Sequence, residues 1–439
     1  MKYYFLGIKG AGLSALATFF YDLGDTVFGY DDAVDYRFTE DELIKRNIPI
    51  YSNGDLTLEK DMLVITSAAL EGEHGEILRC KKAGLEVIGY YEMLGRLSLE
   101  FSTIAVSGTH GKTTTTSLLT HVLNNTSGHE TNYIIGDGSG YSKRGLKNLV
   151  IEACEFKRHF LKYMPSISVI TNIELEHVEC YKDINEIIEA FQEFCQNTKD
   201  IVVACGDEEN VKKLNLDGKG ILYGLNENND VIAKNIILNE NGSSFDCTFN
   251  NNFIGHFNLP LYGKHMIQNA LAVITICHLK KIDSSILENL IKTFKGAKRR
   301  FKETIIDDII IIDDYAHHPT EVKVTLESAR QKYPDKEIVA VMKPNTYTRM
   351  KSLYLEFVDA LKVADKAYVT DIYCDREQQD QYPDVTSNLI LDLLSKGEHI
   401  SEEEISKLLR HKNAVVVFMS CKDVSHLIRS YKKVLGADE

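Results

Sequence analysis

The chain has 439 residues, of which 44% are hydrophobic and 26% are charged, and its formal net charge is −14. Its length predicts two or three globular domains. The acidic balance argues against nucleic acid as the main partner, because a phosphate backbone attracts a basic face. No apolar run reaches the roughly 18 residues of a membrane span. The nine cysteines contain no C-x-x-C pair, so we expect a cytoplasmic protein with reduced thiols.

The first segment, residues 1–100, predicts a Rossmann-like domain. Strand-like stretches such as YYFLGI and TVFGYD alternate with helix-like ones, which is typical of a parallel sheet covered by helices. The first turn, Gly10-Ala11-Gly12-Leu13-Ser14-Ala15, matches G-x-G-x-x-A, and Asp31 follows at the end of the second predicted strand. Such a turn binds nucleotide phosphates at a helix N-terminus. The pattern alone leaves open a nicotinamide or flavin cofactor and another phosphorylated ligand.

The second segment, residues 101–302, opens with the stretch SGTHGKTTTT. TIAV before it predicts a buried strand and the leucines after it predict a helix, which is the context of a phosphate-binding loop. Lys112 would contact the β- and γ-phosphates of ATP, and Thr113 would offer its hydroxyl to Mg²⁺. The motif is incomplete, because Val106 stands where the full pattern has glycine. The expected ATP-binding loop residues are Gly108, Thr109, His110, Gly111, Lys112, Thr113 and Thr114.

The third segment, residues 303–439, alternates again, through IIIIDDYAHHP, EIVAVMKPN, KAYVTDIY and AVVVFMSC. This pattern predicts a second parallel α/β domain. The expected fold class is therefore α/β with three domains: a Rossmann-like N-terminal domain (1–100), a central P-loop ATPase-type domain (101–302) and a Rossmann-like C-terminal domain (303–439).

Several motifs occur in a fixed order along the chain: the glycine turn, GTHGKTTTT, EACEFKRHFL, TNIELEHVECY, YGKHMIQNALA, GAKRRF and DDYAHHPTEV. Together they resemble the Mur ligase family of bacterial cell-wall synthesis, from about residue 2 to residue 435. The histidine of GTHGKT and the run DDYAHHPTE resemble, in particular, members that ligate L-alanine to UDP-N-acetylmuramate. It implies an N-terminal domain that binds the UDP sugar, a central ATPase domain, and a C-terminal domain that closes over ATP and brings the amino acid. The first glycine turn would then hold UDP.

The resemblance also implies the chemistry of peptidoglycan precursor synthesis, on which cell shape and division depend. ATP would convert the lactyl carboxylate into an acyl phosphate, and the amine would displace phosphate. Phosphoryl transfer needs Mg²⁺, a lysine and in-line positioning. Glu155 would complete the Thr113 metal site and His177 would hold a second metal, Mg²⁺ or Mn²⁺. The base that deprotonates the amine stays open between His177, His317 and binding of the neutral amine.

Further roles follow from the same resemblance. His110 would contact the sugar carboxylate, and Arg299 and Arg300 would clamp phosphate where the second and third segments join. Arg349 would hold the carboxylate of the amino acid. The remaining positions are Asn269 for adenine, Asp314 for the ribose, Tyr315 and His317 for the amino-acid pocket, and Gly10, Ala11, Gly12 and Asp31 for the UDP sugar.

Three departures from the family pattern affect the expected site. Asn345 stands where relatives have histidine, Ser420-Cys421-Lys422 replaces a Gly-Ala-Gly run before Asp423, and Cys154 replaces an aspartate. The first two concern the amine, so a sibling ligase for glycine, serine or a stem tripeptide stays open. A nicotinamide oxidoreductase and a module that has lost catalysis are the alternatives from other classes. Monomer and homodimer are both compatible with the sequence.

Overall fold

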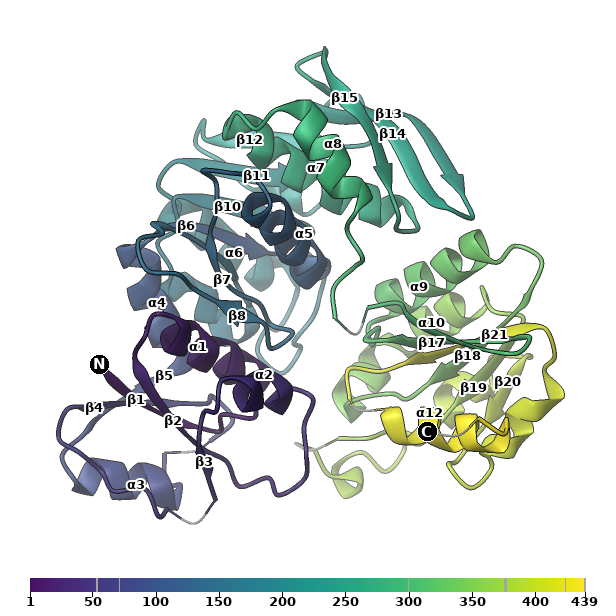
Figure 1. Cartoon of the computed structure of the whole chain (residues 1–439). Coiled ribbons are helices and arrows are strands. Elements are labelled where there is room, and N and C mark those ends of the chain that lie inside the picture. The colour runs from purple at the N-terminus through teal and green to yellow at the C-terminus, as the bar shows by residue number, and fades with distance from the viewer. Residues whose placement is uncertain (53, 71, 299, 375–376, 423, 438–439) are drawn as a thin grey trace. The chain divides into compact units, whose positions relative to one another are not determined.

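The computed structural model describes residues 1–52, 54–70, 72–298, 300–374, 377–422 and 424–437. Its contacts divide the chain into two compact units, each treated by itself. The first unit comprises residues 1–234, 246–256 and 268–294, and the second comprises residues 235–245, 257–267 and 295–439. Three sheets carry the described secondary structure (Figure 1). The mixed α/β architecture predicted from the sequence is confirmed.

The N-terminal sheet is parallel and has the order β3-β2-β1-β4-β5. This is the strand order of a Rossmann fold, whose ligands bind where the order reverses, here between β1 and β4. Runs such as KYYFL and MLVIT form strands because both faces of a parallel sheet are buried. The strands are β1 (Lys2–Leu6), β2 (Thr26–Tyr30), β3 (Ile50–Tyr51), β4 (Met62–Thr66) and β5 (Glu86–Gly89), and the helices are α1 (Ala11–Asp22), α2 (Glu40–Lys45), α3 (Gly75–Lys82) and α4 (Tyr90–Glu100).

The central sheet has the order β15-β14-β13-β12-β11-β10-β6-β9-β7-β8. Its parallel core places the phosphate-loop strand β6 between β10 and β9. The boundary between the two compact units passes through β13, β14, β15 and α7. The strands are β6 (Ser102–Ser107), β7 (Asn132–Ile134), β8 (Gly140–Tyr141), β9 (Asn148–Glu152), β10 (Ile167–Ile170), β11 (Ile201–Cys205), β12 (Gly220–Gly224), β13 (Val231–Asn239), β14 (Gly242–Phe249) and β15 (Asn252–Leu259). The helices are α5 (Lys112–Asn124), α6 (Ile184–Asn197), α7 (Lys264–Leu279) and α8 (Ser284–Lys292), with 3₁₀ turns at Phe156–Lys162 and Val211–Lys213.

The C-terminal sheet has the order β16-β17-β21-β18-β19-β20. Its strands are parallel except β16, which pairs antiparallel with β17 through a hairpin, so the sheet is not wholly parallel as predicted. The strands are β16 (Lys302–Ile306), β17 (Ile309–Asp314), β18 (Glu337–Met342), β19 (Lys366–Val369), β20 (Gly397–His399) and β21 (Ala414–Met419). The helices are α9 (Pro319–Lys332), α10 (Tyr347–Leu361), α11 (Asn388–Leu391) and α12 (Ser425–Val434), with 3₁₀ turns at Gln379–Gln381 and Ile405–Arg410.

Within the first unit, one hydrophobic core joins the N-terminal and central sheets and their helices, and it contains Phe5 of β1, Phe19 of α1, Ile151 of β9 and Phe191 of α6. Helix α1 lies against β8 (Figure 1). Among the described residues, no helix combines the length and the apolar character that a bilayer-spanning segment needs.

Candidate functional site

The first glycine turn lies at the carboxyl end of β1, where the order of the N-terminal sheet reverses. Gly10 is the N-cap of α1, and Ala11 is the first residue of that helix. A Cβ atom on Gly12 would lie 2.8 Å from the ring of Tyr90. Glycine is therefore favoured at position 12, because a larger residue would have to displace the Tyr90 ring that packs on the backbone. The α1 amides face the position that a phosphate takes in this fold.

Asp31 lies beside the turn, at the end of β2. One carboxylate oxygen accepts the backbone N–H of Lys9 at 2.8 Å, and the other accepts that of Ala33 at 3.0 Å. The Lys9 ammonium donates to the Ala33 carbonyl oxygen at 2.8 Å. Asp31 therefore ties the glycine turn to the loop after β2. Its predicted contact with the sugar nucleotide stays a prediction.

The phosphate loop joins β6 to α5, as the motif predicts. Gly111, the N-cap of α5, has φ +83°, a left-handed conformation that favours glycine. A Cβ atom on Gly111 would lie 2.7 Å from the amide oxygen of Asn269, so Asn269 lies beside the loop. A Cβ atom on Gly108 would lie 2.0 Å from the Thr171 hydroxyl. Positive φ angles and close neighbours therefore favour glycine at both positions.

The loop after β10 supports the phosphate loop through contacts that the sequence interpretation missed. The side-chain oxygen of Asn172 accepts the backbone N–H of His110 at 2.8 Å, and its amide nitrogen donates to the His110 carbonyl at 3.1 Å. The Thr109 hydroxyl accepts the N–H of Glu174 at 2.8 Å. The ring of His110 lies 3.6 Å from the Glu174 carboxylate. Polar residues at a strand end, here TN after SISVI, were the available signal.

Lys112 pairs with Glu155 at the start of α5. The Lys112 ammonium lies 3.0 Å from the Glu155 carboxylate, whose side chain is 2% exposed, and it also donates to the Thr109 carbonyl at 3.1 Å. Burial opposes the positive charge, but the combined effect of the neighbouring acidic groups, with Glu155 first, outweighs it and raises the pKa of Lys112. The lysine therefore stays charged. His177 approaches the same carboxylate, with 3.7 Å between its Nε2 atom and a Glu155 oxygen.

Thr113 contacts a different carboxylate. Its hydroxyl donates to Glu152 at 2.5 Å, and the second Glu152 oxygen accepts the N–H of Gly136. Burial raises the pKa of Glu152. The structure thus brings Thr113 to Glu152, and Lys112 and His177 to Glu155.

The donors around these contacts fit a divalent cation. The buried carboxylate of Glu155, the partly exposed carboxylate of Glu152, the Thr113 hydroxyl and the His177 imidazole form an oxygen-rich set of donors with one nitrogen, of the kind that Mg²⁺ or Mn²⁺ prefers. Two carboxylates also face one lysine, Lys112, so a further cation would balance their charge. Thr114, the remaining predicted loop residue, is 5% exposed and lies inside α5.

His159 carries an acid-sensitive contact near this site. Its ring stacks on Tyr91 with 3.8 Å between the ring centroids, and its Nδ1 atom is buried without a hydrogen-bond partner among the described residues. Burial lowers the pKa of His159 to about 4. Burial likewise lowers the pKa of His265, which lies near Arg300, to about 4.

We expect the free energy of unfolding to fall as the pH drops from about 6.5 toward 4. In that window the unfolded chain binds protons on His159 and His265 that the folded chain excludes, so stability rises with pH. His159→Phe should reduce this slope, as measured by urea unfolding across the pH range. His278→Phe, at an exposed histidine, is the control. If the pH dependence of the free energy of unfolding were the same in His159→Phe as in the wild type, the lowered pKa of His159 would be contradicted.

In the second unit, Arg300 and two predicted pocket residues surround Glu321. The Arg300 guanidinium lies 3.3 Å from Glu321 and 5.1 Å from the centroid of the Tyr315 ring. The Nδ1 atom of His317 lies 3.0 Å from the same carboxylate, and His317 packs edge-on against Tyr315. Glu321 is a component that the sequence interpretation did not assign. Arg299 lies outside the described residues.

Asp314 ends β17 and is 4% exposed. Its oxygens accept the N–H groups of Phe301 at 2.7 Å and Ala316 at 2.8 Å, and the Thr325 hydroxyl at 3.3 Å. These hydrogen bonds hold the Asp314 carboxylate in place near Arg300. The ribose contact expected from the resemblance stays a prediction.

Arg349 lies in the first turn of α10, whose N-cap, Thr346, has φ +66°. A β-branched residue in this region is strained, and such strain often occurs at functional sites. The Arg349 guanidinium donates to the Asn345 carbonyl at 3.2 Å, and the Asn345 amide donates to the Tyr373 carbonyl at 2.9 Å. The Glu377 carboxylate accepts the first amides of α10. The Cys421 thiol is near Arg349 and Lys422. Two departures from the family pattern, Asn345 and Cys421, thus lie close to Arg349, the arginine predicted to bind the amino acid.

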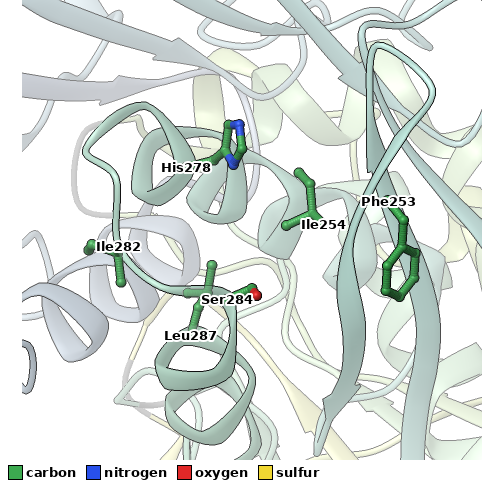
Figure 2. Close-up of a pocket in the computed structure, with 6 residues that line it drawn as sticks. All are labelled: Phe253, Ile254, His278, Ile282, Ser284 and Leu287. Carbon is green, nitrogen blue, oxygen red and sulfur yellow. The ribbon is translucent and has the colours of Figure 1, made fainter.

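A small pocket elsewhere in the first unit has a volume of about 240 Å³. Figure 2 shows that its lining comes from β15, the end of α7 and the start of α8. None of the predicted site residues lines it. The lining residues are Phe253, Ile254, His278, Ile282, Ser284 and Leu287.

Comparisons with known proteins cover nearly the whole chain. The Mur ligase family catalytic domain matches residues 2–102, the Mur ligase middle domain matches residues 106–277, and the Mur ligase glutamate ligase domain matches residues 299–428. Among solved structures, UDP-N-acetylmuramate-alanine ligase MurC from Thermotoga maritima has a TM-score of 0.80 and 25% identity, covering 99% of this chain and 98% of that one.

Two further structures share the fold at lower identity. Murein peptide ligase Mpl from Psychrobacter arcticus has a TM-score of 0.72 at 21% identity, covering 100% of this chain and 99% of that one. MurF ligase from Thermotoga maritima, solved in complex with ADP, has a TM-score of 0.63 at 17% identity, covering 93% and 95%. The chain belongs to the Mur ligase family, the ATP-dependent amide-bond-forming ligases of peptidoglycan precursor synthesis.

Proposed function

We propose that this protein ligates L-alanine to the lactyl carboxylate of UDP-N-acetylmuramate with the consumption of ATP. The likeness to MurC along 99% of the chain supports this choice of substrates. The observation that carries the activation step is the Lys112–Glu155–His177 group beside a strand–turn–helix phosphate loop. Such a group can hold a nucleotide triphosphate in place for phosphoryl transfer.

In the proposed reaction, the lactyl carboxylate attacks the γ-phosphorus of ATP, and ADP leaves. The amine then attacks the resulting acyl phosphate, and inorganic phosphate leaves from the tetrahedral intermediate. The Lys112 ammonium would lie against the negative charge of the transferred phosphoryl group. Bound Mg²⁺, held by Thr113, Glu152, Glu155 and His177, would supply further positive charge.

The remaining predicted residues would bind the UDP sugar, the adenine, the phosphate and the amino acid. The glycine turn at Gly10–Gly12 would receive the diphosphate of UDP, since ligands of a Rossmann-type sheet bind where the strand order reverses. Asn269 beside the loop would bond the adenine, and Arg300 would contact phosphate. Tyr315, His317 and Arg349 would form the amino-acid pocket, with the guanidinium on the carboxylate. We propose a cytoplasmic location because this nucleotide-linked chemistry uses soluble substrates.

The amine is the part of the reaction that the departures at Asn345 and Ser420–Lys422 affect. A sibling ligase that accepts glycine, serine or a stem tripeptide is therefore the second candidate. The nicotinamide oxidoreductase is set aside for two reasons. The chain belongs to a family of ATP-dependent ligases, and Lys112, Glu155 and His177 would have no role in hydride transfer.

Phosphate release from ATP tests the proposal. The reaction contains Mg²⁺ and UDP-N-acetylmuramate with L-alanine, glycine, L-serine or the stem tripeptide in separate samples. We expect release, and a covalent product by mass spectrometry, with L-alanine. Release with another amine alone would assign the sibling activity. Binding of ATP without release for any amine would contradict the ligase proposal and leave a module without catalysis.

A further inference from the structure

Tyr181 lies in the loop between β10 and α6 and contacts Glu155 and His177, two of the residues that we propose as metal ligands. Its side chain is 1% exposed. The hydroxyl donates a hydrogen bond to the backbone carbonyl of Glu155 at 2.5 Å. The backbone N–H of the same residue donates to the carbonyl of His177 at 3.1 Å. Tyr181 therefore connects the Glu155 loop, through its buried hydroxyl, to the His177 loop, through its own backbone.

Both loops have strained backbones. His177 has φ +56°, and Lys157 and Arg158, which follow Glu155, have φ +50° and φ +57°. Left-handed conformations cost free energy in residues other than glycine and persist when neighbouring contacts hold them. Within its own loop, the Glu155 carbonyl accepts the N–H of Arg158 at 2.8 Å. The Tyr181 hydroxyl adds a bond from the opposite loop to the same oxygen.

The side chains that these backbones carry must keep a defined separation. The His177 Nε2 atom lies 3.7 Å from a Glu155 oxygen, and the ring of His177 packs on Phe156 with 4.9 Å between centroids. A ligand pair holds a cation well only when both donors stay within a few tenths of an ångström of their bonding positions.

We propose that Tyr181 is a positioning residue that sets the separation of Glu155 and His177 and thereby the affinity of this site for a divalent cation. The inference rests on the proposed metal role of those two residues. Tyr181 touches neither substrate nor metal in this assignment and acts through the two backbones.

Tyr163 offers a matched control. It is fully buried in the same core as Tyr181. Its hydroxyl has no hydrogen-bond partner among the residues that the structure describes. Tyr163→Phe and Tyr181→Phe therefore remove the same atom from similar surroundings, but only the second removes a tie between the loops.

The test is binding of Mn²⁺, measured by electron paramagnetic resonance with a non-hydrolysable ATP analogue and no sugar or amine. We expect Tyr181→Phe to weaken Mn²⁺ binding about 10-fold, the effect typical of a residue that orients metal ligands. Tyr163→Phe should bind as the wild type does. In the ligase assay, Tyr181→Phe should need more Mg²⁺ with an unchanged KM for UDP-N-acetylmuramate. Thermal unfolding without metal checks that both variants fold, which phenylalanine favours by filling the same space.

Three results would overturn the inference. The first is that Tyr181→Phe binds Mn²⁺ as tightly as the wild type does. The second is that Tyr163→Phe loses as much Mn²⁺ affinity as Tyr181→Phe, which would indicate a general loosening of the core. The third is that the wild type does not bind Mn²⁺. Because the measurement contains no amine, failure of L-alanine ligation would contradict the proposed function and leave this result standing.

Discussion

Replacing Lys112 with methionine is expected to lower ATP-dependent phosphate release about 100- to 1,000-fold, the loss typical of removing a preorganised charge from a reacting group. The same change should destabilise the fold by about 3 kcal/mol, because it leaves a buried carboxylate without its cation. Glu155, the partner at 3.0 Å, is 2% exposed. Phosphate release and urea unfolding measure the two effects on one sample.

The double variant Lys112→Met with Glu155→Gln separates the two effects. Neutralising Glu155 removes the unpaired buried charge, so most of the lost stability should return while activity stays low. A double variant as unstable as the single one would show that packing, not charge, causes the loss. Near-normal phosphate release by Lys112→Met would contradict the role of this lysine.

Gly140→Ala is expected to destabilise the first unit by about 4 kcal/mol, in the range of severe overpacking. A Cβ atom there would lie 1.8 Å from the carbonyl oxygen of Ala15 in α1 and 2.6 Å from the hydroxyl of Thr18. Three hydrogen bonds surround this contact: Thr18 to the Gly140 carbonyl, Ser142 to the Phe19 carbonyl, and Arg144 to the Leu23 carbonyl. Helix α1 would have to move away from β8.

Gly75→Ala is the matched control for this substitution. Gly75 is the first residue of α3, and a Cβ atom there has no neighbour within 4 Å. Its free energy of unfolding should change by less than about 0.5 kcal/mol or increase slightly. Equal stability of the two variants, measured by urea unfolding, would contradict the close packing of α1 on β8.

Much of the fold could be predicted from local patterns. Runs such as IIII before Asp313 and KYYFL after Met1 are long enough and apolar enough to form strands buried on both faces. One strand that was not predicted is β16, because its pairing with β17 depends on a hairpin at Asp307, which has φ +50°; the strands β13, β14 and β15 of the central sheet were not predicted either. The sequence KETII has three polar residues followed by two isoleucines, so it lacks the alternation of polar and apolar residues that identifies a strand, and residue type alone does not say which partner the strand joins.

The candidate site was predicted less completely than the fold. The phosphate loop could be recognised because glycine, lysine and threonine occur at fixed spacing between a strand and a helix. The sequence analysis did not assign Glu321, Asn172 or Tyr181 to the site, because each of them contacts a residue that is distant in the sequence. Their partners lie in other segments: Arg300 for Glu321, His110 for Asn172 and Glu155 for Tyr181. Loop conformations of this kind depend on tertiary contacts rather than on residue type.

Neighbouring residues are enough to specify most strands of the parallel sheets, the glycine turns and the lysine at the start of α5. Tertiary contacts specify which carboxylate meets which partner. Glu152 ends β9 opposite Val106 of β6, so strand register carries it to Thr113. Glu155 lies beyond the strand, where the 3₁₀ turn brings its carboxylate to Lys112. Adjacent strands fix a side chain by their register, whereas a loop fixes it by bonds from elsewhere in the fold, and sequence spacing does not record those bonds.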